Sequence, residues 1–223
     1  MSETEKLAAD KKVGKWFFAS LEKKWINWAV PRLPAWLGGN HLTLTTIIWC
    51  VLIIVFSYLA QYNIHWIWLV SLSIIAQYIT DSLDGALGRY RQAGLLRWGH
   101  YMDHFLDYMF LCSILIGYSF LFNDKFNSLF FILAIFGAYI VNSYLYFSAT
   151  NKFKISYLGI GPTEVRLLFI IINTLLVFFH KTYLVQFLPY VLVFSFLGLC
   201  WVVYNAQKEI WEIDQKNNVD KQQ

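Results

Sequence analysis

The sequence predicts an all-α integral membrane protein with about six transmembrane helices and an N-terminal amphipathic helix at the membrane interface. Its composition differs strongly from that of a soluble domain: 58% of its 223 residues are hydrophobic, 19% aromatic and only 14% charged. Continuously apolar runs, long enough to cross ~30 Å of hydrocarbon as helices, recur along most of the chain. Barrel strands would instead alternate apolar and polar residues over about ten positions, which argues against a membrane β-barrel.

The segment before the first apolar run, residues 13–37, interleaves aromatic residues with lysines at roughly helical spacing. We expect an amphipathic helix lying in the interface that ends near Pro31 and Pro34, because proline interrupts a helix. The polar stretch preceding it has no apolar core and no small-residue cleavage site, so the first span is expected to direct insertion. We therefore assign residues 1–39 to a cytosolic juxtamembrane segment.

Six apolar runs of about twenty residues form the expected membrane domain, which we place at residues 40–208. They begin near His41, Ile64, Gly99, Ser128, Thr163 and Val185. Residues 209–223 are polar and charged, and we expect them to form a cytosolic tail in which the last helix frays.

Basic residues mark one side of these runs. Of the 18 Lys and Arg residues, all but Lys125 and Lys181 lie in the N-terminal segment, around the second and fourth connections, or in the tail. The positive-inside rule then places both termini in the cytosol, in agreement with an even number of spans. Topology and anionic headgroups account for the net charge of +4, so nucleic acid is not an expected partner.

Acidic residues also gather at the cytosolic ends of the runs. Five of the 14 do so, namely Asp81, Asp84, Asp103, Asp107 and Glu164. The first two are three residues apart at the end of the second run, and the next two are four apart at the start of the third, so each pair shares one helix face. Because the connection between these runs is short, we expect antiparallel neighbouring helices whose four carboxylates converge just inside the cytosolic interface.

Four carboxylates this close repel one another unless they hold cations or protons. An all-oxygen, thiol-free ligand set favours Mg²⁺, Mn²⁺ or Ca²⁺, and two facing pairs would suit two ions about 4 Å apart, as in sites that clamp a phosphoryl displacement. Beside them, Gly85 offers bare backbone against which a ligand can lie, and Arg89 offers a bidentate fork for a phosphate. Together these features predict a pyrophosphate site.

The stretch "DSLDGALGRYRQAGLLRWGHYMDHFLD", residues 81–107, resembles the signature of the CDP-alcohol phosphotransferase family. In that signature two aspartates, a glycine, an alanine and an arginine are followed, after a linker, by a glycine and two aspartates. The matching residues are Asp81, Asp84, Gly85, Arg89, Gly99, Asp103 and Asp107. Gly88 stands where the family usually has alanine, and the linker, a cytosolic loop, is one residue longer than usual.

This resemblance implies a six-span transferase of phospholipid biosynthesis. Such an enzyme moves a phosphoalcohol or phosphatidyl group from a CDP-linked donor to a lipid or small-alcohol acceptor hydroxyl and releases CMP. The resemblance makes Asp81, Asp84 and Asp103 ligands of Mg²⁺ or Mn²⁺, with two ions expected, and Asp107 a ligand or the general base. It also assigns contacts with the CDP moiety to Gly85, Arg89 and Gly99, and suggests a homodimer. The position of the carboxylates at the cytosolic ends of the runs makes the active site face the cytosol.

Two features resemble the choline and ethanolamine phosphotransferase branch, in which His104 and Glu164 would help to deprotonate a diacylglycerol hydroxyl. They are the histidine directly after Asp103 and the Gly-Pro-Thr-Glu turn before the fifth run. Each has a structural alternative. His104 lies about 100° round the helix from Asp103 and could be satisfied within the bundle, while Pro and Glu are common in the first turn of any helix.

In the other half of the family, CDP-diacylglycerol is the donor and a small alcohol or alcohol phosphate is the acceptor. That reaction calls for a basic pocket, which Lys152, Lys154 and Arg166 could supply. The sequence by itself leaves the choice between the two arrangements open.

An intramembrane cation or proton transporter is the non-enzymatic alternative, since it too could use membrane aspartates. It would favour carboxylates near the bilayer midplane and helices broken there by Gly or Pro. Here the acids gather at one side, and all four prolines lie outside the Asp-bearing runs. An aspartyl protease would need only two aspartates and would leave the other two unexplained.

Overall fold

The computed structural model describes residues 19–124, 126–150, 162–179 and 182–220, and these residues form helices connected by short turns. The α-helices are α2 (Ala19–Ala29), α3 (Gly39–Leu59), α4 (Ile67–Tyr90), α5 (Leu96–Leu121), α6 (Ser128–Thr150), α7 (Pro162–Phe179) and α8 (Thr182–Asp220). Single 3-10 turns, η1 (Val30–Arg32) and η2 (Ile64–Trp66), precede α3 and α4. The described part of the chain contains no strand, which confirms the all-α prediction.

The six predicted apolar runs correspond to α3 through α8. Five helical stretches are long and apolar enough to cross a membrane, and they are Gly39–Leu59, Ile64–Tyr90, Arg97–Leu121, Ser128–Thr150 and Leu184–Gln215. The run near Thr163 forms α7, whose 18 residues rise about 27 Å and which is not one of those five. These spans confirm a multi-pass membrane fold.

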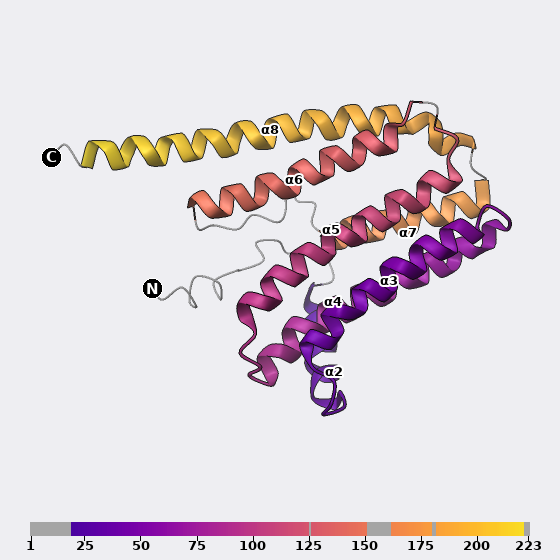
Figure 1. The fold of residues 1–223 in the computed structure, drawn as a ribbon, viewed down its shortest axis with the longest axis horizontal. Coiled ribbons are helices and arrows are strands. Elements are labelled where there is room, and N and C mark those ends of the chain that lie inside the picture. The colour runs from indigo at the N-terminus through magenta and orange to yellow at the C-terminus, as the bar shows by residue number, and fades with distance from the viewer. Residues whose placement is uncertain (1–18, 125, 151–161, 180–181, 221–223) are drawn as a thin grey trace.

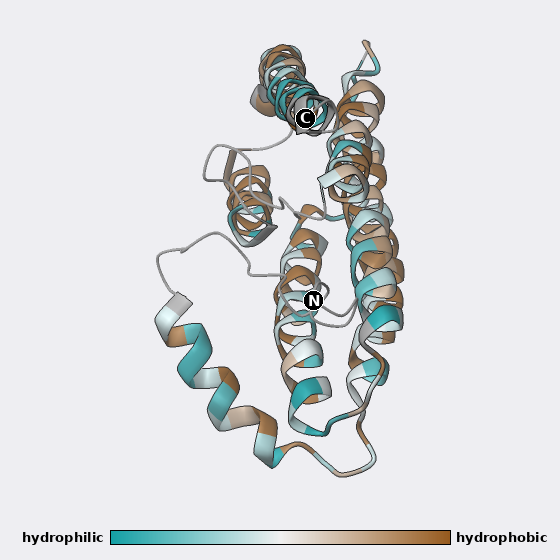
Figure 2. Cartoon of the chain, turned by 90° about the vertical axis from the view of Figure 1, so that its left-hand side faces the viewer, coloured by the Kyte–Doolittle hydropathy of each residue, from teal (hydrophilic) through white to brown (hydrophobic). Residues whose placement is uncertain are grey.

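Helix α2 is the amphipathic helix that the sequence predicts, within the part of residues 13–37 that the structure describes. Hydrophilic and hydrophobic residues alternate along it (Figure 2). Ile26 and Ala29 pack on a small buried cluster shared with α3 and α4, whereas Trp25 and Trp28 are exposed. The helix gives way to η1 just before Pro31, as proline predicts.

Helix α3 packs along both α4 and α5 and holds the bundle together. Two glycines allow these close approaches. A Cβ on Gly39 would lie 2.7 Å from the carbonyl oxygen of Asp84, and a Cβ on Gly117 would lie 2.9 Å from the Cβ of Ser57. Helices α4 and α5 each pack chiefly against α3 and only slightly against each other. The direct packing of α4 on α5 that we expected is therefore largely replaced by packing through α3.

Helix α7 completes the bundle by packing on α4, and a buried polar network ties it in place. The Asn173 amide nitrogen donates to the Ser71 hydroxyl of α4 at 3.1 Å, and the Tyr118 hydroxyl of α5 donates to the Asn173 amide oxygen at 2.9 Å. All three side chains are buried. Hydrogen bonds between helices hold a bundle in lipid, where apolar contact alone gives little preference for a protein neighbour.

Helices α6 and α8 lie side by side at one edge of the molecule (Figure 1). The Tyr139 hydroxyl of α6 donates to the Ser195 carbonyl of α8 at 3.2 Å. Helix α8 continues to Asp220, beyond residue 209 where we expected fraying. No Gly or Pro follows Gly198 in the sequence, so no stop signal ends the helix there.

Candidate active site

Three carboxylates from two helices converge between α4 and α5. Asp81 lies near the end of α4, and Asp103 and Asp107 lie one turn apart near the start of α5. One potential ligand atom from each lies within 4.8 Å of the others. This confirms that the two predicted pairs meet in space, through three of their four members. An oxygen-only group of this size fits a hard divalent cation such as Mg²⁺ or Mn²⁺.

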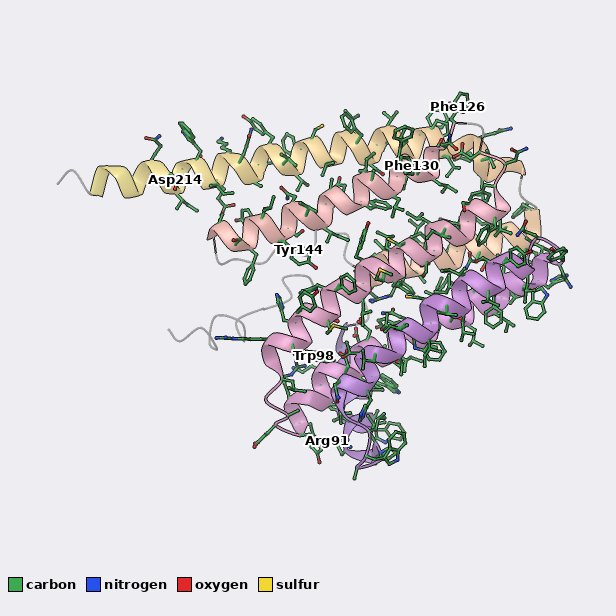
Figure 3. The ribbon with its side chains drawn as sticks, viewed as in Figure 1. Arg91, Trp98, Phe126, Phe130, Tyr144 and Asp214 are labelled. Atoms are coloured by element: carbon green, nitrogen blue, oxygen red, sulfur yellow. The ribbon has the colours of Figure 1, made fainter. Side chains whose placement is uncertain are left out.

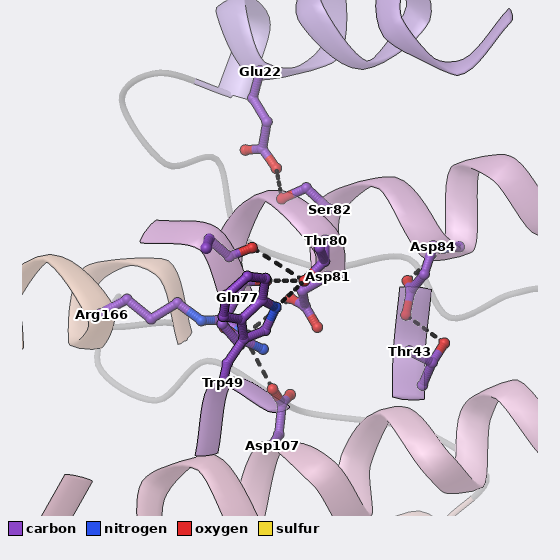
Figure 4. A network of polar contacts seen from close by, with 12 residues as sticks. Glu22, Thr43, Trp49, Gln77, Thr80, Asp81, Ser82, Asp84, Asp107 and Arg166 are labelled. Atoms are coloured by element: carbon purple, nitrogen blue, oxygen red, sulfur yellow. Dashed lines mark hydrogen bonds and ion pairs between the residues drawn. The ribbon is translucent and has the colours of Figure 1, made fainter. Parts of the chain in front are cut away.

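Arg166 of α7 reaches into the same cluster (Figure 4). Its Nη2 donates to Asp81 Oδ2 and to Asp107 Oδ1, each at 3.0 Å, and only 8% of its side chain is exposed. The rings of Tyr78 and Phe110 lie 5.9 and 5.7 Å from the guanidinium carbon. Arg166 therefore joins three helices at one point, an arrangement that the sequence did not reveal.

Asp84, the fourth aspartate, faces α3. It is buried, and it accepts hydrogen bonds from the Thr43 hydroxyl at 2.7 Å and from the backbone N–H of Gly85. Three residues correspond to 300° of helix rotation, so Asp84 lies about 60° round α4 from Asp81. It lies outside the three-carboxylate group, and its assignment as a metal ligand stays a prediction. Thr43, near the start of α3, was not among the predicted site residues.

The three glycines of the motif border open space. A Cβ on Gly85 would meet only the Arg89 guanidinium, at 3.4 Å, and no described atom lies within 4 Å of a Cβ on Gly88 or Gly99. Arg89 itself is exposed, and its guanidinium makes no hydrogen bond or ion pair with the described residues. The site thus has bare helix backbone next to an available cation, as a phosphate ligand requires.

His104 lies on the side of α5 that faces α6. Its ring centre is 4.4 Å from that of His100 and 5.9 Å from that of Tyr144 in α6. Glu164 is in the first turn of α7, two residues before Arg166. Neither belongs to the carboxylate group. Lys152 and Lys154 lie outside the described residues.

Gln77 is a buried polar residue near the site whose side-chain amide lacks hydrogen-bond partners among the described residues. It lies one turn before Asp81 on the same face of α4, it is fully buried, and neither atom of its amide has a hydrogen-bond partner among the described residues. Such a group typically costs about 1–3 kcal/mol. An orphaned amide beneath an acidic cluster is typical of a site that holds a ligand or ordered water.

In the sequence, Arg91 is one of the basic residues around the second connection that indicate topology. In the structure it also anchors the segment between α2 and α3. Its guanidinium donates to four backbone carbonyls, those of Leu33 at 3.1 Å, Pro34 at 2.7 Å, Ala35 at 3.0 Å, and Leu37. This arginine thereby attaches the connection between α2 and α3 to the end of α4. Figure 3 shows Arg91 and Trp98 at the end of the bundle opposite Phe126.

Comparison with known protein families gives a match over most of the chain. Residues 36–203, about three quarters of the chain, match the family described as CDP-alcohol phosphatidyltransferase. The matched region begins before α3, ends within α8 and includes all four aspartates of the motif. No curated protein matches the chain, and no solved structure matches it.

Proposed function

Because the chain belongs to the CDP-alcohol phosphatidyltransferase family, we propose that it transfers a phosphoalcohol or phosphatidyl group from a CDP-linked donor to an acceptor hydroxyl, with release of CMP. The observation that carries this proposal is the convergence of Asp81, Asp103 and Asp107 from α4 and α5. An acidic cluster that borders open glycine backbone and an available arginine suits a pyrophosphate better than it suits transported protons.

The carboxylates are proposed to hold Mg²⁺ or Mn²⁺. Asp81, Asp103 and Asp107 would bind one ion, and Asp84 would contribute to a second. When bound, the ions would neutralise the donor pyrophosphate and the developing charge on CMP. The oxygen-only donor set and the orphaned Gln77 amide are both compatible with a polar ligand at this position.

The donor is proposed to lie along the glycines. Gly85 and Gly99 leave room against the helix backbone, and the Arg89 guanidinium is positioned beside Gly85 to grip a donor phosphate. Asp107 would accept the proton of the acceptor hydroxyl as the reaction proceeds.

The aminoalcohol branch is the arrangement we favour, with CDP-ethanolamine or CDP-choline as donor and diacylglycerol as acceptor. A specific observation supports it. Arg166, one of three cations that the alternative pocket would need, is buried against Asp81 and Asp107. A lipid hydroxyl is a weak nucleophile, and His104 and Glu164 would assist its deprotonation beside Asp107. Because His104 faces α6, its assistance would be indirect.

The decisive experiment is an assay of CMP release by the purified protein in detergent, with CDP-alcohols and CDP-diacylglycerol each offered with candidate acceptors. Radiolabelled CDP-ethanolamine with diacylglycerol should transfer label into the lipid phase. If CDP-diacylglycerol is the only donor that supports CMP release, the aminoalcohol branch is refuted and the family reaction stands. Cation flux without CMP release under any combination would favour the transporter alternative.

Metal dependence has its own test in the same assay. A chelator should abolish CMP release, and added Mg²⁺ or Mn²⁺ should restore it, because the clustered carboxylates would bind the donor poorly without cations. Full activity in chelator would contradict the metal site while leaving the family assignment in place.

We also propose that both termini and the active site face the cytosol and that the protein forms a homodimer in the bilayer. The basic residues near the site support this orientation through the positive-inside rule. Reporter fusions at each terminus would test the topology, and crosslinking in native membranes would test the dimer.

A further inference from the structure

We propose that Arg166 is a positioning residue of the metal site: it holds Asp81 and Asp107 in a preformed arrangement and remains paired with them when a divalent ion and the donor bind. This inference rests on the proposed function, because it assumes that the carboxylates bind a cation. It assigns Arg166 no contact with a substrate phosphate, in contrast to the basic pocket that the sequence suggested.

The geometry of the contact suits positioning. A single guanidinium nitrogen, Nη2, lies 3.0 Å from one oxygen of Asp81 and 3.0 Å from one oxygen of Asp107. It therefore fixes the spacing of two ligands that come from different helices. A carboxylate has two oxygens with about four lone-pair positions, so the hydrogen bond from Arg166 does not itself prevent Asp81 or Asp107 from also ligating a cation.

Burial argues that Arg166 stays in place. Only 8% of its side chain is exposed, and the rings of Tyr78 and Phe110 flank the guanidinium. Displacement by an incoming ion would separate a buried charge from both of its carboxylates, and a buried charge without a partner is strongly unfavourable. The ion is therefore expected to add to this arrangement rather than replace part of it.

The charges support the same conclusion. Three carboxylates and one guanidinium leave a formal charge of −2, which one divalent ion offsets. A second ion would draw on Asp84 or on the donor pyrophosphate.

Two other roles for Arg166 predict different results. If the guanidinium competes with the ion for Asp81 and Asp107, removing it should tighten metal binding. If it serves instead as a phosphate contact, removing it should leave metal binding unchanged and weaken substrate binding. Positioning alone predicts weaker metal binding together with an unchanged donor KM at saturating Mn²⁺.

The test measures Mn²⁺ binding to the purified protein in detergent, without donor, from the electron paramagnetic resonance signal of free Mn²⁺. Arg166→Gln should raise the Kd for Mn²⁺ by about tenfold or more, as is typical when a hydrogen-bond partner of metal ligands is lost. Arg166→Lys keeps the charge and should recover part of the affinity. Arg89→Gln removes a cation that does not contact the three carboxylates, and should change the Kd by less than about twofold.

Unchanged or tighter Mn²⁺ binding by Arg166→Gln would overturn the inference while leaving the proposed reaction standing, provided that the wild type binds Mn²⁺ and releases CMP. If Arg166→Gln does not fold, Arg166→Lys decides, because positioning predicts weaker Mn²⁺ binding with a donor KM that is unchanged at saturating Mn²⁺. A raised donor KM with unchanged Mn²⁺ binding would assign Arg166 to the phosphate. A wild type that binds no Mn²⁺ would overturn the inference together with the proposed metal site.

Discussion

The bundle of α3, α4, α5 and α7 and the pair of α6 and α8 use similar apolar residues in different ways. In an apolar 18-residue stretch of each of α3, α4 and α5, 33%, 39% and 44% of the residues are buried inside the protein, against 22% in α6 and 11% in α8. Helix α8 presents many of its apolar side chains outward, including Phe194 and Trp201. In a bilayer these side chains meet lipid, so their exposure carries little cost.

The contacts between helices explain the difference. Lipid is as apolar as leucine, so membrane helices are fixed by close packing at small residues and by hydrogen bonds between helices. The bundle has both, at Gly39 and Gly117 and in the network of Asn173. The carboxylate cluster and Arg166 add charged contacts across three of its helices. The functional part of this membrane protein is therefore recognised by polar contacts between helices, and hydrophobicity does not distinguish it.

The largest effect is expected when a charge is removed from the bundle rather than from the pair. Asp103→Asn should lower CMP release by at least about a hundredfold, because an amide is a poorer ligand for a divalent ion than a carboxylate. Asp214→Asn makes the same change on an exposed residue of α8 and should leave activity within about twofold. Figure 3 shows how far Asp214 lies from the Arg91 end of the bundle.

Thermal unfolding in detergent should accompany these measurements to show that both variants fold. Equal losses of activity in Asp103→Asn and Asp214→Asn would contradict the location of the site in the bundle.

The next effect concerns close packing. Gly117→Ala should destabilise the protein by about 1–3 kcal/mol, because its Cβ would lie 2.9 Å from the Ser57 Cβ, which cannot rotate away. Gly198→Ala in α8 should cost less, since its Cβ would meet the Tyr139 hydroxyl, the far end of a side chain that can move. Denaturation midpoints of the two variants check this, and a larger loss in Gly198→Ala would reverse the ranking of the two regions.

Two neighbouring arginines at the end of α4 are expected to have different roles, one in donor binding and one in stability. Arg89→Lys keeps the charge but loses the planar fork, so it should raise the donor KM by about tenfold with little change in stability. Arg91→Lys should instead lower stability, because a lysine cannot reach the several carbonyls that Arg91 binds. Steady-state kinetics and thermal unfolding of both variants separate these effects. An unchanged donor KM in Arg89→Lys would indicate that Arg89 does not bind the donor and contributes only to membrane topology.

The smallest effect is expected on the outer face of the pair. Phe194 is 73% exposed, and Phe194→Leu should change stability by no more than about 0.5 kcal/mol. Phe169 of the bundle is buried in the main apolar core, and the same substitution there should cost at least about 1 kcal/mol. Comparable unfolding midpoints for the two variants would show that α8 is packed more closely than its exposure indicates.

The sequence by itself determined the membrane class, the six apolar helices and the amphipathic helix before them. Each rests on a local property, such as the length of an apolar run or the position of Pro31, and local properties can be read along the chain. The spacing of Asp81, Asp103 and Asp107 was equally informative, because helix periodicity fixes which residues share a face.

Only the tertiary structure decided which residues from separate helices complete the site. Arg166 lies 85 residues from Asp81 along the chain, and no periodicity within one helix could predict that it pairs with both Asp81 and Asp107. The rotation of Asp84 toward Thr43 likewise depends on how closely α3 approaches α4 at Gly39. Spacing along a helix determines the face on which a side chain lies, whereas its partner depends on the packing between helices, which involves residues distant in the sequence.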